Sequence, residues 1–214
     1  MALAYLPSIL WGGLNTFKLL GSAMCLAVPL GLLLGLIRYR KVPILSVIAV
    51  AYIDFFRTSV ALVLICWCYY ALPVLIQVNL DTYVAVTLAL GLQASAFMAE
   101  LVRAGLQAVA KGQWEAAKAL GMPYNTSLRY IVLPQAFRKI LPVFFLLVIE
   151  VIKNTSLAGV VTYPELFYNA GTAASTSYRP IEIFTMVGAI YFVIIFSAGQ
   201  AVRVLERHLA RVDR

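Results

Sequence analysis

Long runs of apolar residues alternate with short polar stretches along this chain. A helix that crosses the hydrocarbon core of a bilayer, about 30 Å thick, needs about 20 consecutive and mostly apolar residues. Four runs have this length, at about Trp11–Ile37, Tyr83–Val102, Ile140–Val161 and Ile181–Val204. We expect a transmembrane helix in each, because the bilayer core offers no water to bond the backbone of a loop or an open sheet.

A further apolar run, Val42–Val78, is too long to be one spanning helix. Its 37 residues would extend, at about 1.5 Å per residue, to roughly 55 Å. Charged residues also interrupt it. We therefore expect an interfacial helix over about Pro43–Phe56, a break near Arg57-Thr58-Ser59 and a span over about Val60–Val78. The expected fold is all-α, an integral membrane domain with about five transmembrane helices that covers residues 1–214.

The composition excludes an ordinary soluble globular protein. Of the 214 residues, 63% are hydrophobic and 12% are charged, whereas soluble domains have about 25% charged residues. The mean hydropathy is +0.90. A bilayer is the solvent in which a chain this apolar needs no polar coat, so membrane lipids are expected to surround it.

The positive charges indicate how the chain is oriented. The formal net charge is +8, and 14 of the 17 Lys and Arg residues fall on one predicted side of the membrane. Cytoplasmic loops carry such an excess, so we expect the N-terminus outside and the C-terminus in the cytoplasm, which requires an odd number of spans. Nucleic acid is then not an expected partner. The 14 residues are Arg38, Arg40, Lys41, Arg57, Arg103, Lys111, Lys118, Arg129, Arg138, Lys139, Arg203, Arg207, Arg211 and Arg214.

The sequence gives no indication of an enzyme active site or a metal site. Paired carboxylates, clusters of metal-binding residues and nucleophile–base pairs do not rise above chance. The phosphate-binding pattern Gly-x-x-x-x-Gly-Lys-Ser/Thr is missing. Cys25, Cys66 and Cys68 lie within apolar runs, where cysteine behaves as a small apolar side chain. We therefore expect no catalytic residue, bound metal or cofactor in this chain.

A basic connection at about residues 104–138, between the third and fourth spans, predicts two short cytoplasmic helices. The first covers roughly Gly112–Leu120, and Gly121 has the residue type that ends a helix in the left-handed conformation. The second is expected to run until Pro134, because proline disfavours helical backbone at the residue before it. Small side chains at Ala116 and Ala117 would let this knob sit closely in a partner's groove. Candidate caps of the second helix are Asn125, Thr126 and Ser127.

The same connection contains a spaced sequence pattern. It reads Glu-Ala-Ala, three residues, Gly, nine residues, Ile, one residue and Leu-Pro, and its members are Glu115, Ala116, Ala117, Gly121, Ile131, Leu133 and Pro134. The pattern resembles the signature loop of permeases in ATP-binding-cassette importers. Other segments resemble the polar amino-acid branch of that family, so the resemblance covers about residues 12–208. They are Lys111-Gly112-Gln113-Trp114, Leu133-Pro134-Gln135-Ala136-Phe137-Arg138, Phe56-Arg57, Ala99-Glu100, Lys153-Asn154-Thr155-Ser156-Leu157 and Pro164-Glu165-Leu166.

The resemblance implies a role in ATP-driven import of polar amino acids or related small solutes. It implies that the loop docks on a separate cytoplasmic ATPase through Glu115, Ala116, Ala117 and Gly121. Two ATPase subunits would hold ATP and Mg²⁺, and their closure would move two permease subunits as rigid bodies. The other implied partners are a second permease subunit, identical or homologous, and an extracellular or periplasmic solute-binding protein. The implied location is the inner membrane of a bacterial cell.

Charged residues inside the fourth predicted span are candidates for a translocation path. Glu150 and Lys153 are three residues apart, on one face of a helix. A charge near the centre of a span costs about 2.5–3.5 kcal/mol, and the two signs together would suit a zwitterion. The alternative is an internal ion pair or a contact with the second subunit. The neighbouring candidates for the path are Asn154, Thr155 and Ser156.

Polar residues of the third predicted span have two interpretations. Gln93 and Ser95 are candidates for the path, although hydrogen bonds between helices explain them as well. At the inner end of this span, Glu100 and Arg103 form another pair three residues apart, which we interpret as a structural ion pair.

Two other classes of function remain open from the residues. One is a self-contained channel or secondary transporter, which would need no ATPase. The other is a membrane assembly factor that carries no solute. Copurification of a soluble ATPase, and its loss on changing Glu115, would distinguish the importer permease from both.

Overall fold

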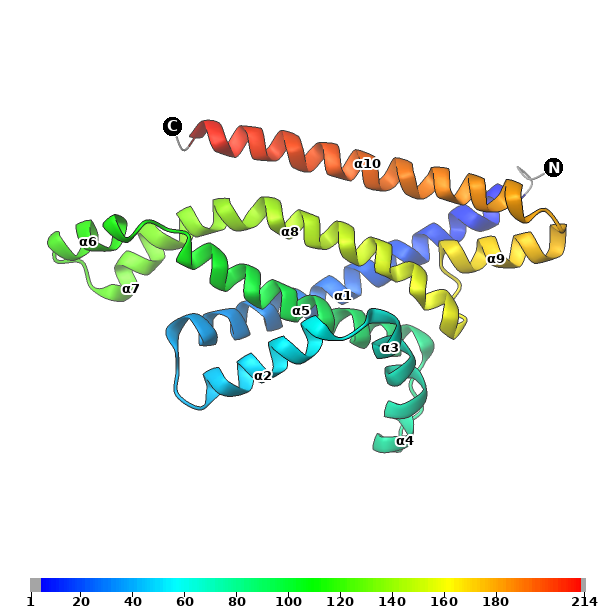
Figure 1. The fold of residues 1–214 in the computed structure, drawn as a ribbon, viewed down its shortest axis with the longest axis horizontal. Helices are drawn as coiled ribbons and strands as arrows, with labels where there is room; N and C mark the ends of the chain where they lie inside the picture. The colour runs from blue at the N-terminus through cyan, green and yellow to red at the C-terminus, as the bar shows by residue number, and fades with distance from the viewer. Residues whose placement is uncertain (1–4, 213–214) are drawn as a thin grey trace.

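The computed structural model describes residues 5–212, and every regular element in this range is a helix. The four long ones run back and forth along the longest axis of the molecule (Figure 1). Each, with its flanking helical turns, is long and apolar enough to cross a membrane, which confirms the four spans expected at these places. They are α1 (Leu6–Arg40), α5 (Thr82–Gln107), α8 (Leu133–Thr155) and α10 (Pro180–Val212).

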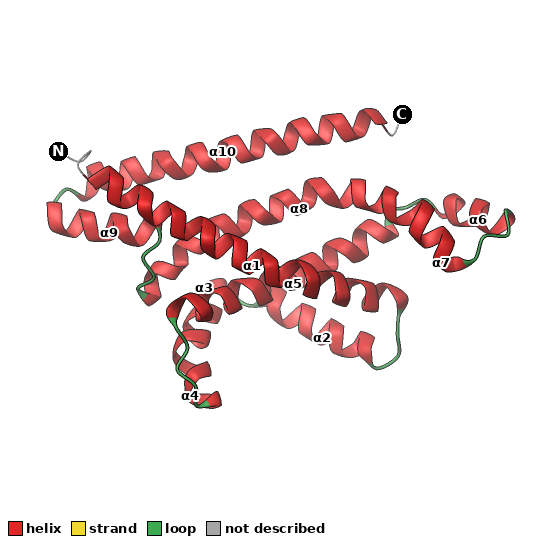
Figure 2. Ribbon diagram, turned by 180° about the vertical axis from the view of Figure 1, so that it is seen from behind, coloured by secondary structure: helices red, strands yellow, loops and turns green. Residues whose placement is uncertain are grey.

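The tightest helix pair is α1 against α5, and α1 crosses α5 closely in the view from behind (Figure 2). Glycines let the two backbones approach. A Cβ atom added at Gly31 would lie 2.5 Å from the Cβ of Met98, and one added at Gly35 would lie 2.6 Å from the carbonyl oxygen of Ala99. Small residues at such contacts hold helices together in lipid, where apolar side chains gain nothing by leaving the solvent.

The second apolar run is broken, as expected, but its outer part is not the straight span predicted over Val60–Val78. Helix α2 (Leu45–Thr58) ends at Ser59, and the chain then bends by 106° into a short helical arm. With α2 and this arm counted together as one bent span, the described part of the chain has the five spans that the sequence predicts. The arm consists of α3 (Ala61–Cys66), the π-helical turn η2 (Trp67–Ala71) and α4 (Leu72–Ile76).

The basic connection forms a knob, Lys111–Val132, at one end of the long axis (Figure 1). Gly121 has a φ of 70° and ends the first helix as predicted. The second helix differs from the prediction: it starts at Tyr124 without a side-chain cap, and it does not end at Pro134. The knob contains α6 (Lys111–Ala119), α7 (Tyr124–Ser127) and the π-helical turn η3 (Leu128–Val132).

The π-helical turn η3 explains why Pro134 does not end the helix. Proline lacks a backbone N–H, and its ring clashes with the carbonyl four residues earlier in a regular helix. The wider turn over Leu128–Val132 absorbs this clash. As a result, one uninterrupted helical segment runs from Tyr124 to Val161.

The polar stretch expected as a loop at about Thr162–Pro180 contains a helix. Helix α9 (Leu166–Ser177) lies at the end of the molecule opposite the knob, beside the starts of α1 and α10 (Figure 1). It follows α8 through the 3-10 turn η4 (Ser156–Val161). The carboxylate of Glu165 caps its first turn, a local signal that the polar composition of the stretch concealed.

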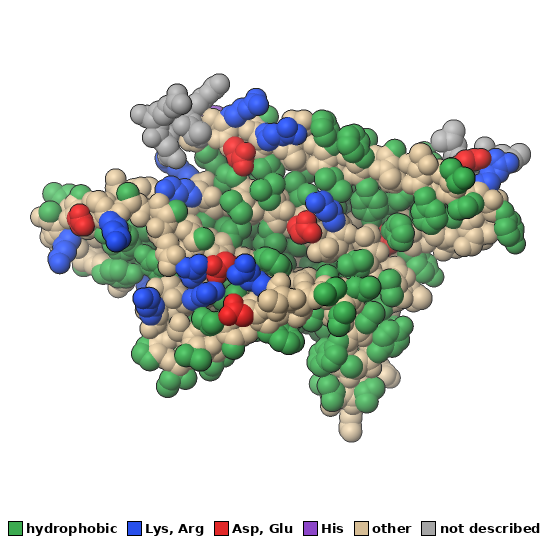
Figure 3. Space-filling view, viewed as in Figure 1, with side chains coloured by type: hydrophobic (Ala, Val, Ile, Leu, Met, Phe, Trp, Pro, Cys, Tyr) green, Lys and Arg blue, Asp and Glu red, His purple; other side chains and the backbone are tan. Residues whose placement is uncertain are grey.

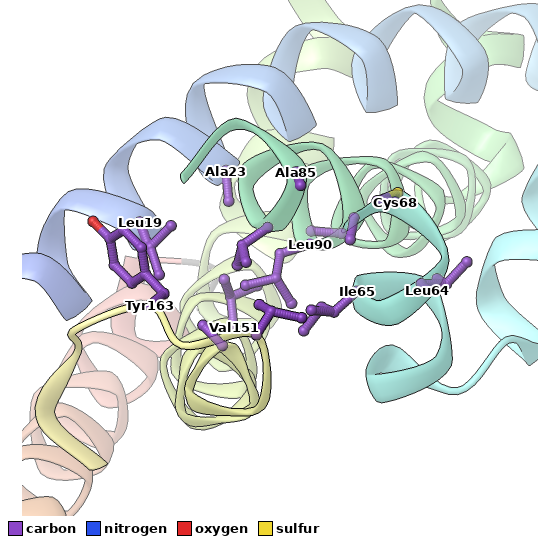
Figure 4. Packing of buried hydrophobic residues seen from close by; sticks show 14 of the residues in the cluster. Leu19, Ala23, Leu64, Ile65, Cys68, Ala85, Leu90, Val151 and Tyr163 are labelled. Atoms are coloured by element: carbon purple, nitrogen blue, oxygen red, sulfur yellow. The ribbon is translucent and has the colours of Figure 1, made fainter. Parts of the chain in front are cut away.

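Buried apolar residues from α1, α3, η2, α5, α8 and η4 meet in the middle of the molecule (Figure 4). Leu19 and Ala23 come from α1, Leu90 from α5, Ile65 from α3 and Val151 from α8. The outer faces of the helices are largely apolar as well (Figure 3), as expected for surfaces that meet lipid or another membrane chain. Of the 14 predicted inner charges, Arg214 and the side chain of Arg211 lie outside the described part of the chain.

Candidate functional site

The knob presents one part of the sequence pattern to solvent and buries another. Glu115, Ala116 and Gly121 are exposed, whereas Ala117 packs inside the knob. Leu120 stands out most, with 79% of its surface exposed. The knob therefore offers both an acidic and an apolar exposed side chain to a partner, while Ala117 packs on its inside.

Side-chain contacts make the knob rigid. The rings of Trp114 in α6 and Tyr124 in α7 stack with centroids 5.1 Å apart. The Gln135 side-chain amide in α8 donates a hydrogen bond to the Gln113 side chain in α6, at 3.1 Å. Since Tyr124–Val161 is one helical segment, the knob and α8 share a continuous helical backbone.

The candidate charges of the fourth span lie on an open face of α8. Lys153 Nζ lies 3.3 Å from Glu150 Oε2, and the side chains are 48% and 58% exposed. The pair predicted from their spacing is therefore present, and protein atoms of this chain leave both partners uncovered. The neighbours differ from them: Asn154 is half-buried, Thr155 is fully buried and bonds the carbonyl of Ile152, and the Ser156 hydroxyl bonds the carbonyl of Lys153.

A cavity of about 540 Å³ opens between α2, α5 and α8 and reaches Glu150. Its walls are mainly apolar, but four charged side chains of both signs reach it. They are Arg57, Glu100, Lys139 and Glu150. The Arg57 guanidinium lies 5.7 Å from the centre of the Phe97 ring, and Lys139 Nζ donates to the carbonyl of Ala108 at 2.6 Å.

The carboxylate of Glu100 is the centre of an ion-pair cluster at the knob end of the spans. Arg38 of α1 and Arg103 of α5 both pair with it. Arg103 Nε lies 3.2 Å from each Glu100 oxygen. The structural ion pair expected between Glu100 and Arg103 is confirmed, and Arg38 adds a link between α1 and α5.

The polar candidates of the third span are engaged in helix packing. Gln93 Nε2 donates to the carbonyl of Ser59 at 2.8 Å, at the break between α2 and α3. Ser95 is fully buried, and its hydroxyl lies 2.7 Å from that of Tyr52 in α2. These contacts support the helix-packing interpretation of both residues and explain how α5 stabilises the broken segment.

Sequence reasoning missed three residues at these sites. Arg57 and Lys139 served as markers of topology, yet they line the cavity with Glu150. Glu165 belonged to a quoted segment but received no role, and it is fully buried beside Tyr191 of α10. A signal for Glu165 was its place three residues after Thr162, where the polar stretch starts, and directly before a helix-forming run.

Known proteins match this chain along most of its length. The profile of the family described as "binding-protein-dependent transport system inner membrane component" matches residues 27–211. The chain is 36% identical over 204 residues to the probable glutamine ABC transporter permease protein GlnP of Bacillus subtilis (strain 168), with 93% of each chain covered. It is 30% identical over 212 residues to the glutamate/aspartate import permease protein GltK of Escherichia coli O157:H7, with 96% of this chain and 95% of that one covered.

Solved structures show the same fold. A crystal structure of an amino acid ABC transporter with histidines superposes with a TM-score of 0.90 at 31% identity, covering 96% of each chain. An inward-facing structure of the MetNI methionine ABC transporter gives a TM-score of 0.66 at 20% identity, covering 91% of this chain and 93% of that one. At that identity the second match concerns the fold alone.

Proposed function

Since the chain belongs to the family of binding-protein-dependent transport system inner membrane components, we propose how its knob and its charged helix face carry out transport. The chain is a permease subunit of an ATP-binding-cassette importer of the polar amino-acid type, and ATP hydrolysis belongs to a separate subunit. A self-contained channel or secondary transporter is not favoured, because relatives over nearly the whole length are importer permeases.

The knob Lys111–Val132 is the proposed contact with the ATPase. Glu115 and Ala116 would touch it, Gly121 would shape the turn, and Ala117 would keep the two knob helices in contact. The observation that carries this proposal is the unbroken helical segment Tyr124–Val161, which joins the exposed knob to the face with Glu150 and Lys153. Movement of the ATPase would then be transmitted to the membrane as a rigid-body shift of α8.

The open face of α8 is the proposed wall of the translocation path. Glu150 and Lys153 would meet the ammonium and carboxylate groups of an amino acid, with Asn154 and Ser156 beside them. Two exposed charges inside a span are costly unless water or another chain faces them, which supports a water-filled path shared with a second permease subunit. Thr155, Gln93 and Ser95 bond neighbouring backbone or side-chain atoms and would shape the wall from behind.

The proposed assembly contains two permease subunits, identical or homologous, two ATPase subunits with ATP and Mg²⁺, and an external solute-binding protein. The knob would lie in the cytoplasm, and α9 would then face the outside of a bacterial inner membrane. The excess of Lys and Arg at the knob end supports this orientation.

The test is uptake by the reconstituted complex. The chain would be purified with the ATPase and binding protein that accompany it, placed in proteoliposomes and offered labelled L-glutamine, L-glutamate and L-arginine, the amino acids in the relatives' names. We expect uptake of at least one that requires ATP hydrolysis. Uptake that continues without hydrolysable ATP would contradict the proposal. So would a purification in which no ATPase accompanies the chain.

A further inference from the structure

Glu165 is a fully buried carboxylic acid directly before α9. Its two oxygens accept hydrogen bonds from the backbone N–H groups of Phe167 and Tyr168, at 2.7 and 2.6 Å. The hydroxyl of Tyr191 in α10 donates a third, at 3.2 Å. None of the ion pairs among residues 5–212 includes Glu165. A buried carboxylate without a cation is costly to keep ionised.

Groups from α10, α1 and η4 surround the carboxyl of Glu165. Tyr191 is the titratable side chain that faces it from α10. From α1, the Thr16 hydroxyl accepts a hydrogen bond from the N–H of Leu166 at 3.3 Å. From η4, Gly159 approaches so closely that an added Cβ would lie 3.3 Å from a Glu165 oxygen. Neither Thr16 nor Gly159 titrates, so the proton equilibrium here concerns Glu165 and Tyr191.

The segment that carries Glu165 is also held to α1. Asn15 donates to the carbonyl of Pro164 at 2.8 Å, and Asn169 donates to the carbonyl of Ser8 at 2.9 Å. A Cβ added at Gly12 would lie 2.7 Å from the carbonyl oxygen of Glu165. The start of α9 is therefore clamped between α1 and α10, with the carboxyl of Glu165 at the centre of the clamp.

This clamp lies beneath the wall of a second cavity. The cavity has a volume of about 1090 Å³ and opens between η4, α9 and the start of α10. Gly159 and Tyr168 line it, and both also contact Glu165. Its polar lining consists of hydroxyl groups without a charged side chain, which would let a zwitterion pass without being trapped. The hydroxyl residues are Ser156, Tyr168, Thr172, Ser175, Thr176 and Tyr178.

We propose that Glu165 is a proton-linked latch of the outer end of the path, which binds a proton when α9 packs against α1 and α10 and releases it when α9 moves away. The assignment of this end to the outside of a translocation path rests on the proposed function, whereas the latch itself rests on the contacts of the Glu165 carboxyl. Movement of α9 away from α1 and α10 would open the cavity wall and expose the Glu165 carboxyl to water. Opening of α9 and ionisation of Glu165 therefore favour each other.

The direction of the coupling follows from burial. Desolvation raises the pKa of Glu165 from 4.5 to about 7, although the two backbone N–H groups and Tyr191 lower it. When α9 opens, water returns the pKa toward its ordinary value. The packed state therefore binds the proton more tightly, and acid favours it. The ratio of open to packed states is expected to rise with pH by up to about tenfold per unit between the two pKa values.

The test measures this opening in the intact complex, without a transported solute. Ala173 lies in α9 and is buried against the cluster that joins α9 to α10. In an Ala173→Cys variant, a membrane-impermeant maleimide would label the thiol only when α9 moves away. Asn79→Cys, in the exposed turn before α5, corrects for the pH dependence of the reagent. We expect the ratio of the two labelling rates to rise at least about tenfold from about pH 5 to about pH 8.

Three variants separate a latch from a residue that only supports the fold. E165Q should make the labelling ratio independent of pH. Y191F removes one donor to the ionised carboxylate without touching the cap of α9, so the midpoint of the pH dependence should move to higher pH. E182Q, at an exposed position near the start of α10, should match the unchanged chain. The proposal is overturned if the labelling ratio of the unchanged chain does not vary with pH. It is also overturned if Y191F does not move the midpoint of the pH dependence.

Uptake gives the second readout. In proteoliposomes that take up L-glutamine, the maximal rate should depend on external pH, and Y191F should shift that profile in the same direction as the labelling midpoint. A merely structural role would lower the rate equally at every pH, and that result would overturn the latch. A pH-dependent labelling ratio in a complex that takes up no amino acid would instead contradict the proposed function and leave the latch standing.

Discussion

The ammonium of Lys153 lies 3.3 Å from the carboxylate of Glu150 on a face of α8 that the rest of the described chain leaves open. An exposed pair three residues apart on a helix contributes only about 0–1 kcal/mol to stability. The two charges are therefore poorly explained by what they do for the folded monomer. Their position, near the end of a helical segment that starts in the knob, is one basis of the proposal that they line the translocation path.

We expect E150Q and K153Q each to lower the ATP-driven uptake rate by about tenfold or more, a loss of about 1.4 kcal/mol in transition-state stabilisation. Basal ATPase activity and the amount of folded complex should stay near those of the unchanged chain. The matched control is the pair Arg179 and Glu182, which has the same spacing, a 3.1 Å contact and similar exposure. Unchanged uptake and unchanged solute stimulation in both α8 variants would remove this pair from the path.

Replacing Glu115 should weaken the contact with the ATPase. Glu115 is exposed on α6, so its loss should leave the permease folded. We expect E115A to reduce copurified ATPase by about tenfold, as for a contact worth about 1.4 kcal/mol. The quantity measured is the molar ratio of ATPase to permease after affinity purification.

The control for this experiment is E206Q, an exposed acidic position near the end of α10. It should leave the ratio unchanged. A full complement of ATPase on the E115A chain would place the coupling contact elsewhere.

The α1–α5 contact should tolerate no side chain at Gly31. A Cβ there would lie 2.5 Å from the Cβ of Met98, and overpacking of this kind costs about 1–3 kcal/mol. G31A should therefore lower the thermal midpoint of the detergent-purified complex, measured by size-exclusion after heating. G21A is the control, because no atom lies within 4 Å of the added Cβ. Equal midpoints for the two variants would show that α1 and α5 can separate freely.

Loss of the Glu100 carboxylate should destabilise the knob end of the spans. Two arginines from α1 and α5 share this partner and are partly buried. E100Q leaves both with a weaker acceptor, at a cost of about 1.5–3 kcal/mol for hydrogen bonds to charged groups. The thermal midpoint should fall, while R179Q, which removes an exposed pair, should change it little. If the thermal midpoint of E100Q were as high as that of R179Q, water would be able to replace the Glu100 carboxylate without loss of stability.

Stability should depend on pH through Glu165. Burial raises the pKa of Glu165 in the folded chain to about 7, above its value in the unfolded chain, so the folded state binds the proton more tightly. The resulting stability is complete below about pH 4.5 and is lost as pH rises to about 7, to a total of about 3 kcal/mol. The thermal midpoint of the complex should fall over this window. E165Q should flatten that fall, and a steep fall that persists in E165Q would assign it to other groups.

The sequence alone determined the membrane helices, the basic knob and the family. A spanning helix depends on the length and polarity of one continuous stretch, because its backbone bonds are satisfied within that stretch. The four long spans were therefore predicted in the right places, although α8 begins seven residues before Ile140 and α10 ends eight residues after Val204. The left-handed turn at Gly121 and the spacing of Glu150 and Lys153 are local in the same sense.

Only the tertiary structure decided how these parts are joined. The bend at Ser59 depends on a bond from Gln93, 34 residues away. The continuity of the knob with α8 depends on a π-helical turn before Pro134, and the cavity joins Arg57 of α2 to Glu150 of α8. Glu165 meets Tyr191 only because α9 packs against α10. Contacts between residues far apart in the sequence leave no periodic signal in either segment, so no pattern along the chain could have revealed them.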